Sequence, residues 1–183
     1  MSTILKLTAA EYDSMIERGA FDGLQRRIEL IRGELREMNP AGPVHEDYID
    51  YLNRWSVSST EASDCVVRVQ SSIDLDDSRP EPDIAWLKPG RYARRRPQAA
   101  DVLLVIEVAG SSPKDDLEEK AALYAQFDIA EYWVVDIQGR CIHVHRQSDG
   151  TRFQEVVQVA SGDSIAPVCK PSATLVLAEL LAE

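Results

Sequence analysis

Two acidic side chains lie in segments that are otherwise apolar. Glu107 follows five consecutive aliphatic residues, 102–106, and Asp83 stands between Pro82 and the apolar segment 84–87. An ionised carboxylate inside a buried strand is unfavourable unless a cation, a metal ion or several hydrogen-bond donors face it. If the two segments are antiparallel neighbours, both carboxylates converge into a site of oxygen ligands for a hard divalent cation. The simpler alternatives are exposure of Glu107 at a strand end and an ordinary Pro-Asp turn at Asp83.

A lysine follows on the next predicted helix. Lys120 lies four residues after Asp116, so both side chains share one helical face and can form an ion pair. The spacing alone favours a solvated surface ion pair, which contributes little free energy.

Four further side chains are weaker candidates. Glu34, at a predicted hairpin turn, is an accessory ligand or a solvated carboxylate, and we favour the solvated carboxylate. His45 either faces a phosphate or a site carboxylate, or lies on the surface. His143 and His145 share one face of a predicted strand and could bind a transition metal. No cysteine or carboxylate joins them at ligand spacing, which favours a polar strand face.

A dense basic cluster lies in the predicted loop 88–100. Arg91, Arg94, Arg95 and Arg96 could contact phosphates, or could offset acidic neighbours in a solvated loop. The chain as a whole is acidic, because 20 Lys and Arg against 31 Asp and Glu give a net charge of −11. This charge argues against broad electrostatic adhesion to nucleic acid or anionic lipid and leaves only a local basic groove.

Hydrophobic spacing and turn residues predict the elements that position these side chains. The capping-box spacing of Thr8 and Glu11, with Gly19 as a helix end, predicts a helix over 9–18. Two alternating segments around Arg32-Gly33 predict a β-hairpin. The other expected elements are a helix carrying Tyr48, Tyr51, Leu52 and Trp55, strands at 65–73, 83–87, 101–108, 131–136 and 141–146, a helix at 111–127, weaker strands at 153–157 and near Thr174, and a helical C-terminus.

This order of elements predicts an α/β or α+β sandwich in a single domain, 1–183. Apolar residues make up 44% of the chain and charged residues 28%, as in globular proteins. We expect no membrane segment, because the longest apolar segment has five residues and a span needs about 20. The first ten residues lack a secretory leader pattern, so we expect a cytoplasmic protein with free thiols at Cys65, Cys141 and Cys169 rather than disulfides or a zinc site.

Several motifs occur together in a recognisable order. They are Pro82-Asp83, Ile106-Glu107-Val108, Asp116-Leu117-Glu118-Glu119-Lys120 with Tyr124, and Glu131-Tyr132-Trp133-Val134-Val135-Asp136, preceded by Ile28-Glu29-Leu30-Ile31-Arg32-Gly33-Glu34, Met38-Asn39-Pro40 and His45. Over about residues 7–146 this combination resembles the Uma-type family of putative restriction endonucleases, within the PD-(D/E)XK nuclease superfamily.

The resemblance implies a restriction-endonuclease-like mixed β-sheet flanked by helices, with an N-terminal helix and β-hairpin. It implies that Asp83, Glu107 and the Val108 carbonyl bind Mg²⁺ (or Mn²⁺) for hydrolysis of DNA phosphodiester bonds. The superfamily lysine two residues after the glutamate is absent, because Ala109 stands there. The family places this lysine on the following helix, so Lys120 would assist the attacking water.

Two other functions remain open on the sequence. The net charge of −11 favours a catalytically silent module with the nuclease fold that binds a protein or nucleic acid. A metalloenzyme that uses His143 and His145 is the third alternative. A homodimer is also expected, because exposed strand edges at 141–146 and 153–157 need a cover.

Overall fold

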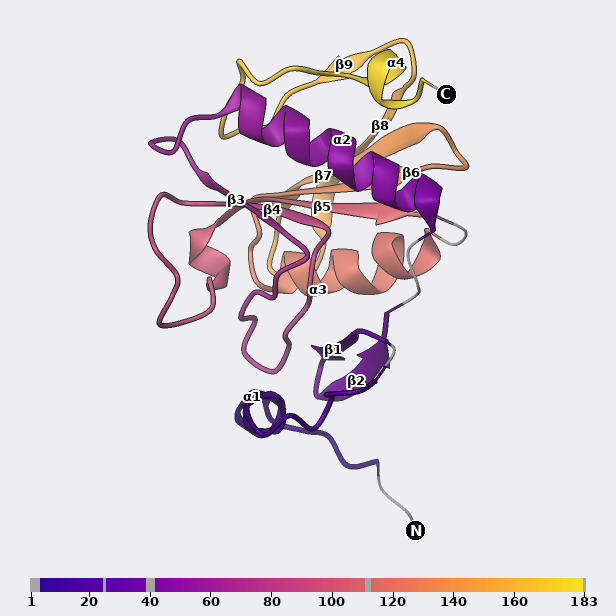
Figure 1. The fold of residues 1–183 in the computed structure, drawn as a ribbon. Coiled ribbons are helices and arrows are strands. Elements are labelled where there is room, and N and C mark those ends of the chain that lie inside the picture. The colour runs from indigo at the N-terminus through magenta and orange to yellow at the C-terminus, as the bar shows by residue number, and fades with distance from the viewer. Residues whose placement is uncertain (1–3, 25, 39–41, 111–112, 183) are drawn as a thin grey trace.

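The computed structural model describes residues 4–24, 26–38, 42–110 and 113–182, and its centre is a six-stranded sheet (Figure 1). The strand order is β3-β4-β5-β6-β7-β8, in which β5 and β6 are parallel and the other neighbours are antiparallel. The strands are β3 (Val66–Val69), β4 (Ile84–Leu87), β5 (Val102–Ala109), β6 (Glu131–Asp136), β7 (Cys141–Ser148) and β8 (Phe153–Ala160). The expected mixed sheet flanked by helices is confirmed.

The pairing of β4 with β5 determines where the acidic residues lie. The two strands are antiparallel, with Ile84 opposite Ile106. Asp83 therefore stands just before β4, beside the end of β5 that carries Glu107. Nearly every residue of β5 is buried, which explains why its sequence is apolar without alternation. The start of β4 and the end of β5 are therefore neighbours, as a site shared by the two carboxylates requires.

One face of the sheet is covered by α2 (Pro43–Ser59) together with the C-terminal elements (Figure 1). A proline at the start of a helix is favoured because its missing N–H needs no partner there, and Pro43 occupies that position. Leu52 and Trp55 point into the core, as their helical spacing predicts. The C-terminal elements are β9 (Ser164–Ile165), β10 (Leu175–Val176) and α4 (Leu177–Leu180), which confirm a strand next to Thr174 and a helical end.

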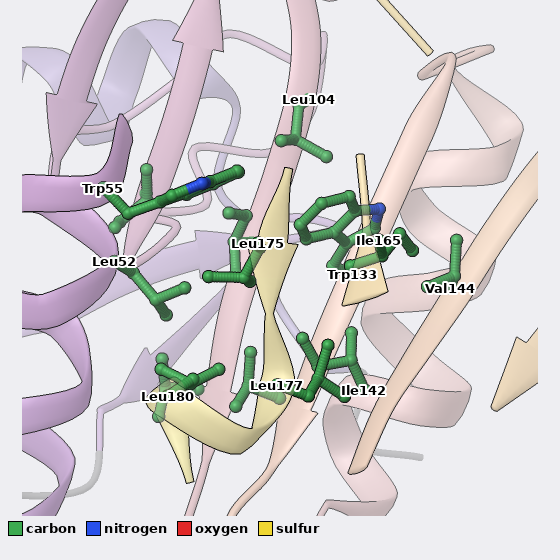
Figure 2. Close-up of a cluster of buried hydrophobic side chains, with 14 of the residues drawn as sticks. Leu52, Trp55, Leu104, Trp133, Ile142, Val144, Ile165, Leu175, Leu177 and Leu180 are labelled. Atoms are coloured by element: carbon green, nitrogen blue, oxygen red, sulfur yellow. The ribbon is translucent and has the colours of Figure 1, made fainter. Parts of the chain in front are cut away.

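Figure 2 shows the core between this layer and the sheet, where α2, β5, β6, β7 and the C-terminal segment contribute side chains. Trp55 packs against Trp86 and Trp133, with ring centroids 5.2 and 5.9 Å apart. Their polar edges are satisfied, because the Trp55 indole donates to the Thr174 carbonyl and the Trp86 indole donates to the Ser56 hydroxyl. Buried indole N–H groups need such partners. This layer holds β4, β5 and β6 in a fixed position behind the acidic side chains.

The opposite face of the sheet is covered by α3 (Ala121–Gln126) (Figure 1). A π-helical segment (Asp116–Lys120) precedes α3 without a break. The predicted helix over 111–127 is thus confirmed from 114 onward, while residues 111–112 lie outside the described residues. Ala121, Leu123, Tyr124 and Ala125 are buried in the core on this face of the sheet.

The N-terminal segment forms α1 (Ala9–Glu17) and a hairpin of β1 (Ile28–Ile31) and β2 (Glu34–Glu37). The predicted capping box is present, because Glu11 N–H and Thr8 Oγ1 are hydrogen bonded and the Glu11 carboxylate accepts from Thr8 N–H. The hairpin turns at Arg32 and Gly33, with φ of 51° and 79°. Two positive φ values are characteristic of a type I′ turn, whose twist matches the paired strands.

Two local predictions are corrected by the structure. The strand predicted over 65–73 ends at Val69, because Gln70 adopts φ 45° and turns the chain out of the ladder. The predicted loop 88–100 runs into a short 3₁₀ helix (Ala99–Asp101), which the Asp101 carboxylate caps through the Gln98 N–H. No helix within the described ranges is long and apolar enough to cross a membrane.

Candidate functional site

Asp83 and Glu107 are connected through the backbone at the paired ends of β4 and β5. The Asp83 N–H donates to Glu107 Oε2 at 3.3 Å, and the Val108 N–H donates to Asp83 Oδ2 at 2.9 Å. Gln70 donates to the other Asp83 oxygen at 3.3 Å. Asp83 is only 5% exposed and Glu107 only 3%. These bonds fix the position of both carboxylates from adjacent strands.

Lys120 reaches Glu107 from the π-helical segment. Its ammonium lies 3.0 Å from Glu107 Oε1 and 3.5 Å from Asp116 Oδ1, the ion pair predicted from the four-residue spacing. The Tyr124 hydroxyl donates to the same Glu107 oxygen at 2.9 Å. π-helical turns are rare and occur often at functional sites. Two donors from one helical stretch therefore converge on one carboxylate oxygen.

Glu29 also belongs to this cluster, although neither its residue type nor its spacing from the other members indicates this. It lies on β1, is 6% exposed, and its carboxylate is 3.9 Å from the Lys120 ammonium. The Glu81 N–H donates to its other oxygen at 3.2 Å. The strand periodicity does indicate that Glu29 is buried, because Glu29 and the core residue Ile31 are two positions apart and point to the same face of the strand. The long-range contact between the hairpin and the helix has no counterpart in the sequence pattern.

His45, at the start of α2, lies 3.4 Å from Asp83 Oδ2. Its hydrogen bond to Asp83, opposed by burial and aided by a bond to the Val108 backbone, raises the pKa of the imidazole. Burial would raise the pKa of Asp83, but the hydrogen bonds from His45 and from the Val108 N–H outweigh burial and hold that pKa below its usual value. Asp83 is thus maintained as a carboxylate, and the histidine is oriented toward it.

Negative charge exceeds positive charge in this cluster. The carboxylates of Glu29, Glu107 and Asp116 lie within 3.9 Å of the Lys120 ammonium, and a fourth carboxylate, Asp83, adjoins Glu107. Burial raises the pKa of Glu107 to about 8; Lys120 opposes this rise, and the other carboxylates add to it. Burial opposes the charge of Lys120, but its carboxylate neighbours outweigh burial and raise the pKa of the ammonium. Buried carboxylates in excess of their counter-charge fit a divalent cation, which prefers oxygen ligands.

The other acidic candidate, Glu34, lies elsewhere on the hairpin. Its carboxylate pairs with Arg36 at 2.8 Å and with Lys6 at 3.8 Å. Within the described part of the chain it makes no ion pair with Lys120. The structure thus places Glu34 in an ion-pair group with Lys6 and Arg36.

The arginine cluster divides into two pairs with different surroundings. Arg95 pairs with Asp101 at 2.5 Å, and Arg96 pairs with Asp13 at 2.6 Å. Arg91 and Arg94 are exposed, and neither forms an ion pair with any residue that the structure describes. Only this second pair has guanidinium groups that are available to an incoming phosphate.

The two strand histidines have separate environments. His145 is 4% exposed and packs against Tyr132 and Phe153. His143 lies beside Cys141 and Asp136, so the expectation that no cysteine or carboxylate joins the histidines is wrong. The predicted His143–His145 pair is therefore not the group that could hold a metal. Cys65, Cys141 and Cys169 carry free thiols, of which Cys141 belongs to this metal-ligating group.

Comparison with known proteins agrees with this architecture. A structure described as a putative nuclease belonging to DUF820, from Anabaena variabilis, superimposes with a TM-score of 0.73 over 92% of this chain and 97% of that chain. At 14% sequence identity this similarity establishes the fold. No curated protein matches the chain.

A family model provides the sequence relationship that the distant structural similarity does not. The model of Uma2, described as putative restriction endonuclease, matches residues 9–177. This range includes α1, the hairpin, the whole sheet and every member of the carboxylate cluster. The chain belongs to the Uma2 family of putative restriction endonucleases.

Proposed function

We propose that this protein is a metal-dependent endonuclease that hydrolyses DNA phosphodiester bonds. The observation that carries the proposal is the convergence of Asp83, Glu107 and Lys120 from three separate elements. Membership of a family described as putative restriction endonucleases supports this choice of substrate. A phosphodiester is a stable anion, and its hydrolysis needs a positioned cation and an activated water.

The two carboxylates at the strand ends are the proposed metal ligands. Asp83 and Glu107, with the Val108 carbonyl, would hold Mg²⁺ or Mn²⁺ through oxygen atoms. A strand residue directs its N–H and C=O toward the same side, and the Val108 N–H points at Asp83. When bound, the cation supplies charge that polarises a phosphoryl oxygen and acidifies water. The hydrogen bond from the Asp83 N–H to Glu107 Oε2 keeps the two residues adjacent, which supports their assignment as joint ligands.

Lys120 acts in this proposal as a fixed positive charge. Its carboxylate neighbours keep the ammonium protonated, so it donates hydrogen bonds and does not accept a proton. A donor at this position orients the attacking water and stabilises the charge that develops on the phosphate. Glu29 and Asp116 hold the ammonium in place, and Tyr124 holds the Glu107 carboxylate.

His45 and the loop arginines are accessory to this core. His45 is proposed as a donor that orients Asp83, in line with the 3.4 Å contact. Arg91 and Arg94 are proposed to contact DNA phosphates, while the ion pairs of Arg95 and Arg96 favour a structural role for those two. A homodimer would supply two such sites for a double-strand cut.

The test combines metal binding with cleavage. Titration of Mg²⁺ or Mn²⁺ by calorimetry, and nicking of supercoiled plasmid, are measured for the wild type and for Asp83→Asn and Glu107→Gln. Each variant is expected to lose metal binding and at least about 100-fold in nicking rate. Glu17→Gln removes one exposed carboxylate from α1 and serves as the charge-matched control, with unchanged binding and nicking.

A second function has one observation in its favour. The net charge of −11 suits a silent nuclease-fold module that binds a partner better than it suits an enzyme that meets DNA. In that case the folded wild type shows no nicking with either metal. Metal-dependent nicking that disappears in Glu107→Gln contradicts the silent module.

A further inference from the structure

A second cluster of metal-ligating side chains lies at the turn between β6 and β7. Asp136 ends β6, Cys141 begins β7 and His143 follows two residues later. One ligand atom from each lies within 4.8 Å of the other two. The Cys141 thiol is 3.5 Å from His143 Nε2, and this nitrogen is 3.9 Å from Asp136 Oδ2. The antiparallel pair of strands thus brings thiol, imidazole and carboxylate together.

We propose that Asp136, Cys141 and His143 form a binding site for Zn²⁺, or for a similar transition-metal ion, with water as the fourth ligand. This proposal is independent of the proposed nuclease activity. Zinc takes thiolate, imidazole and carboxylate ligands in tetrahedral geometry, at about 2.3, 2.0–2.1 and 2.0–2.2 Å. These bond lengths require the three ligand atoms to be about 3.4–3.6 Å apart. The thiol–imidazole distance of 3.5 Å already has this value, whereas the carboxylate, 3.9 Å from the imidazole, would move closer on binding.

The turn itself orients the carboxylate toward the other two ligands. The Gly139 N–H donates to Asp136 Oδ1 at 2.7 Å, which leaves Oδ2 facing His143. A ligand whose second atom is held by a neighbouring donor is a recurring feature of metal sites. A side chain at position 139 would collide with this carboxylate, so glycine leaves the space that it occupies. Asp136 is 14% and His143 20% exposed at the side chain, so an ion can enter from solvent.

This site is distinct from the carboxylate cluster in position and in chemistry. Glu107 lies opposite Val134, which in turn lies opposite His143, so His143 is two strands from Glu107 on the same face, while Asp136 lies on the strand between them, opposite Ala109. Two strand spacings correspond to about 10 Å. The first cluster offers oxygen atoms, which suit Mg²⁺, whereas sulfur and nitrogen ligands select zinc-like ions. On binding, the thiol proton of Cys141 passes to solvent as the sulfur–metal bond forms.

Cobalt titration of the reduced, full-length protein without a histidine tag tests this assignment. Co²⁺ bound to a thiolate gives a sulfur-to-metal charge-transfer band and tetrahedral ligand-field bands in the absorption spectrum. The wild type is expected to show both features on binding Co²⁺ at the Cys141 site, and Zn²⁺ but not excess Mg²⁺ is expected to abolish them. The same spectrum is expected in a Cys65→Ser/Cys169→Ser double variant, in which Cys141 is the remaining thiol.

Two ligand variants and one separate-site control complete the test. Cys141→Ser removes the charge-transfer band, and His143→Ala weakens Co²⁺ binding by at least about tenfold while the thiol remains. Glu107→Gln leaves the cobalt spectrum unchanged, because its carboxylate belongs to the other cluster. Circular dichroism confirms that each variant is folded. The proposal is overturned if the wild type gives no thiolate band, or if the band persists in Cys141→Ser or disappears in Glu107→Gln.

Discussion

Lys120 is the residue on which the charge balance of the main cluster depends. Its ammonium contacts the carboxylates of Glu107, Asp116 and Glu29, at 3.0, 3.5 and 3.9 Å. Replacing one partner of a buried ion pair lowers the free energy of unfolding far more than replacing both partners with apolar residues. The reason is that the remaining charge stays buried without compensation. The same residue therefore affects both stability and the proposed chemistry.

Lys120→Met is expected to lower the free energy of unfolding in EDTA by up to about 3–5 kcal/mol at alkaline pH. A carboxylate with a raised pKa binds its proton more tightly in the folded state, so its ionisation lowers stability as pH rises toward the folded value. For Glu107 this window extends from the ordinary pKa of 4.5 to about 8 in the wild type. Without Lys120 the window extends to higher pH. Urea unfolding at several pH values measures this difference.

Lys170→Met is the matched control for this variant. Lys170 pairs with Asp64 at 2.5 Å, but both side chains are about one-third exposed. Exposed ion pairs are screened by solvent and contribute little to stability, so Lys170→Met should change the free energy of unfolding far less than Lys120→Met. If both variants lost the same free energy of unfolding across this pH range, burial of the Lys120 cluster would not be the cause of the loss in Lys120→Met.

At the scale of elements, the hairpin brings Glu29 to Lys120 and depends on its tight turn. Gly33 has φ 79°, and a Cβ there would lie 2.9 Å from the Leu7 carbonyl and from Lys6 Cβ. Gly33→Ala is therefore expected to lower the free energy of unfolding by at least about 1–2 kcal/mol. Urea denaturation measures the loss. Gly162→Ala, where the space is open and φ is not positive, should change stability by less than about 0.5 kcal/mol.

The helix α2 is held by its buried face. Leu52 is fully buried within the core that includes Trp55 and Trp86, so Leu52→Ala is expected to cost about 2–5 kcal/mol. Val57, on the same helix, is 60% exposed, and Val57→Ala should cost less than about 0.5 kcal/mol. Thermal and urea unfolding compare the two. Similar losses would contradict the orientation of α2 on the sheet.

Elements with strong local patterns could be predicted from the sequence. The capping box at Thr8, the glycine turn at Gly33 and the apolar segment of β5 each have a local physical cause, and each appears in the structure. The strand predicted over 65–73 extended too far, because Gln70, Ser71 and Ser72 interrupt the apolar alternation before Ile73. The left-handed conformation of Gln70, which ends the ladder at Val69, is uncommon for a residue with a side chain and was not expected from its residue type.

The candidate site shows the same division between local and long-range information. Asp83, Glu107 and Lys120 could be selected because their strands and helix follow one another in the chain and pair as neighbours. Glu29 and the Asp136–Cys141–His143 cluster depend on contacts whose register is set only by folding. The sequence also did not indicate which loop arginines are paired within the protein, because the partners of Arg96 are Asp13 and Ser72, far away in the sequence.

At the scale of the whole molecule, an acidic protein must approach a polyanion through a limited surface. The net charge of −11 repels DNA at a distance, so any local cations carry a large share of the attraction. Arg91 and Arg94 lie in the loop between β4 and β5. This loop is at the end of the two strands that is away from Asp83 and Glu107. Each phosphate contact contributes about 0.9 to the slope of log affinity against log salt concentration.

Replacing both arginines, Arg91→Ala and Arg94→Ala, is expected to weaken DNA binding and to reduce that salt slope by about 1.8, because two phosphate contacts are lost. Fluorescence anisotropy with labelled duplex DNA and Ca²⁺, over a range of salt concentrations, measures both quantities. Arg152→Ala is the control for the loss of one exposed cation, since Arg152 is 77% exposed on the turn between β7 and β8. A double variant whose salt slope equals that of the wild type would show that this loop does not contact the phosphates, and the path of the DNA would then have to be sought on another surface.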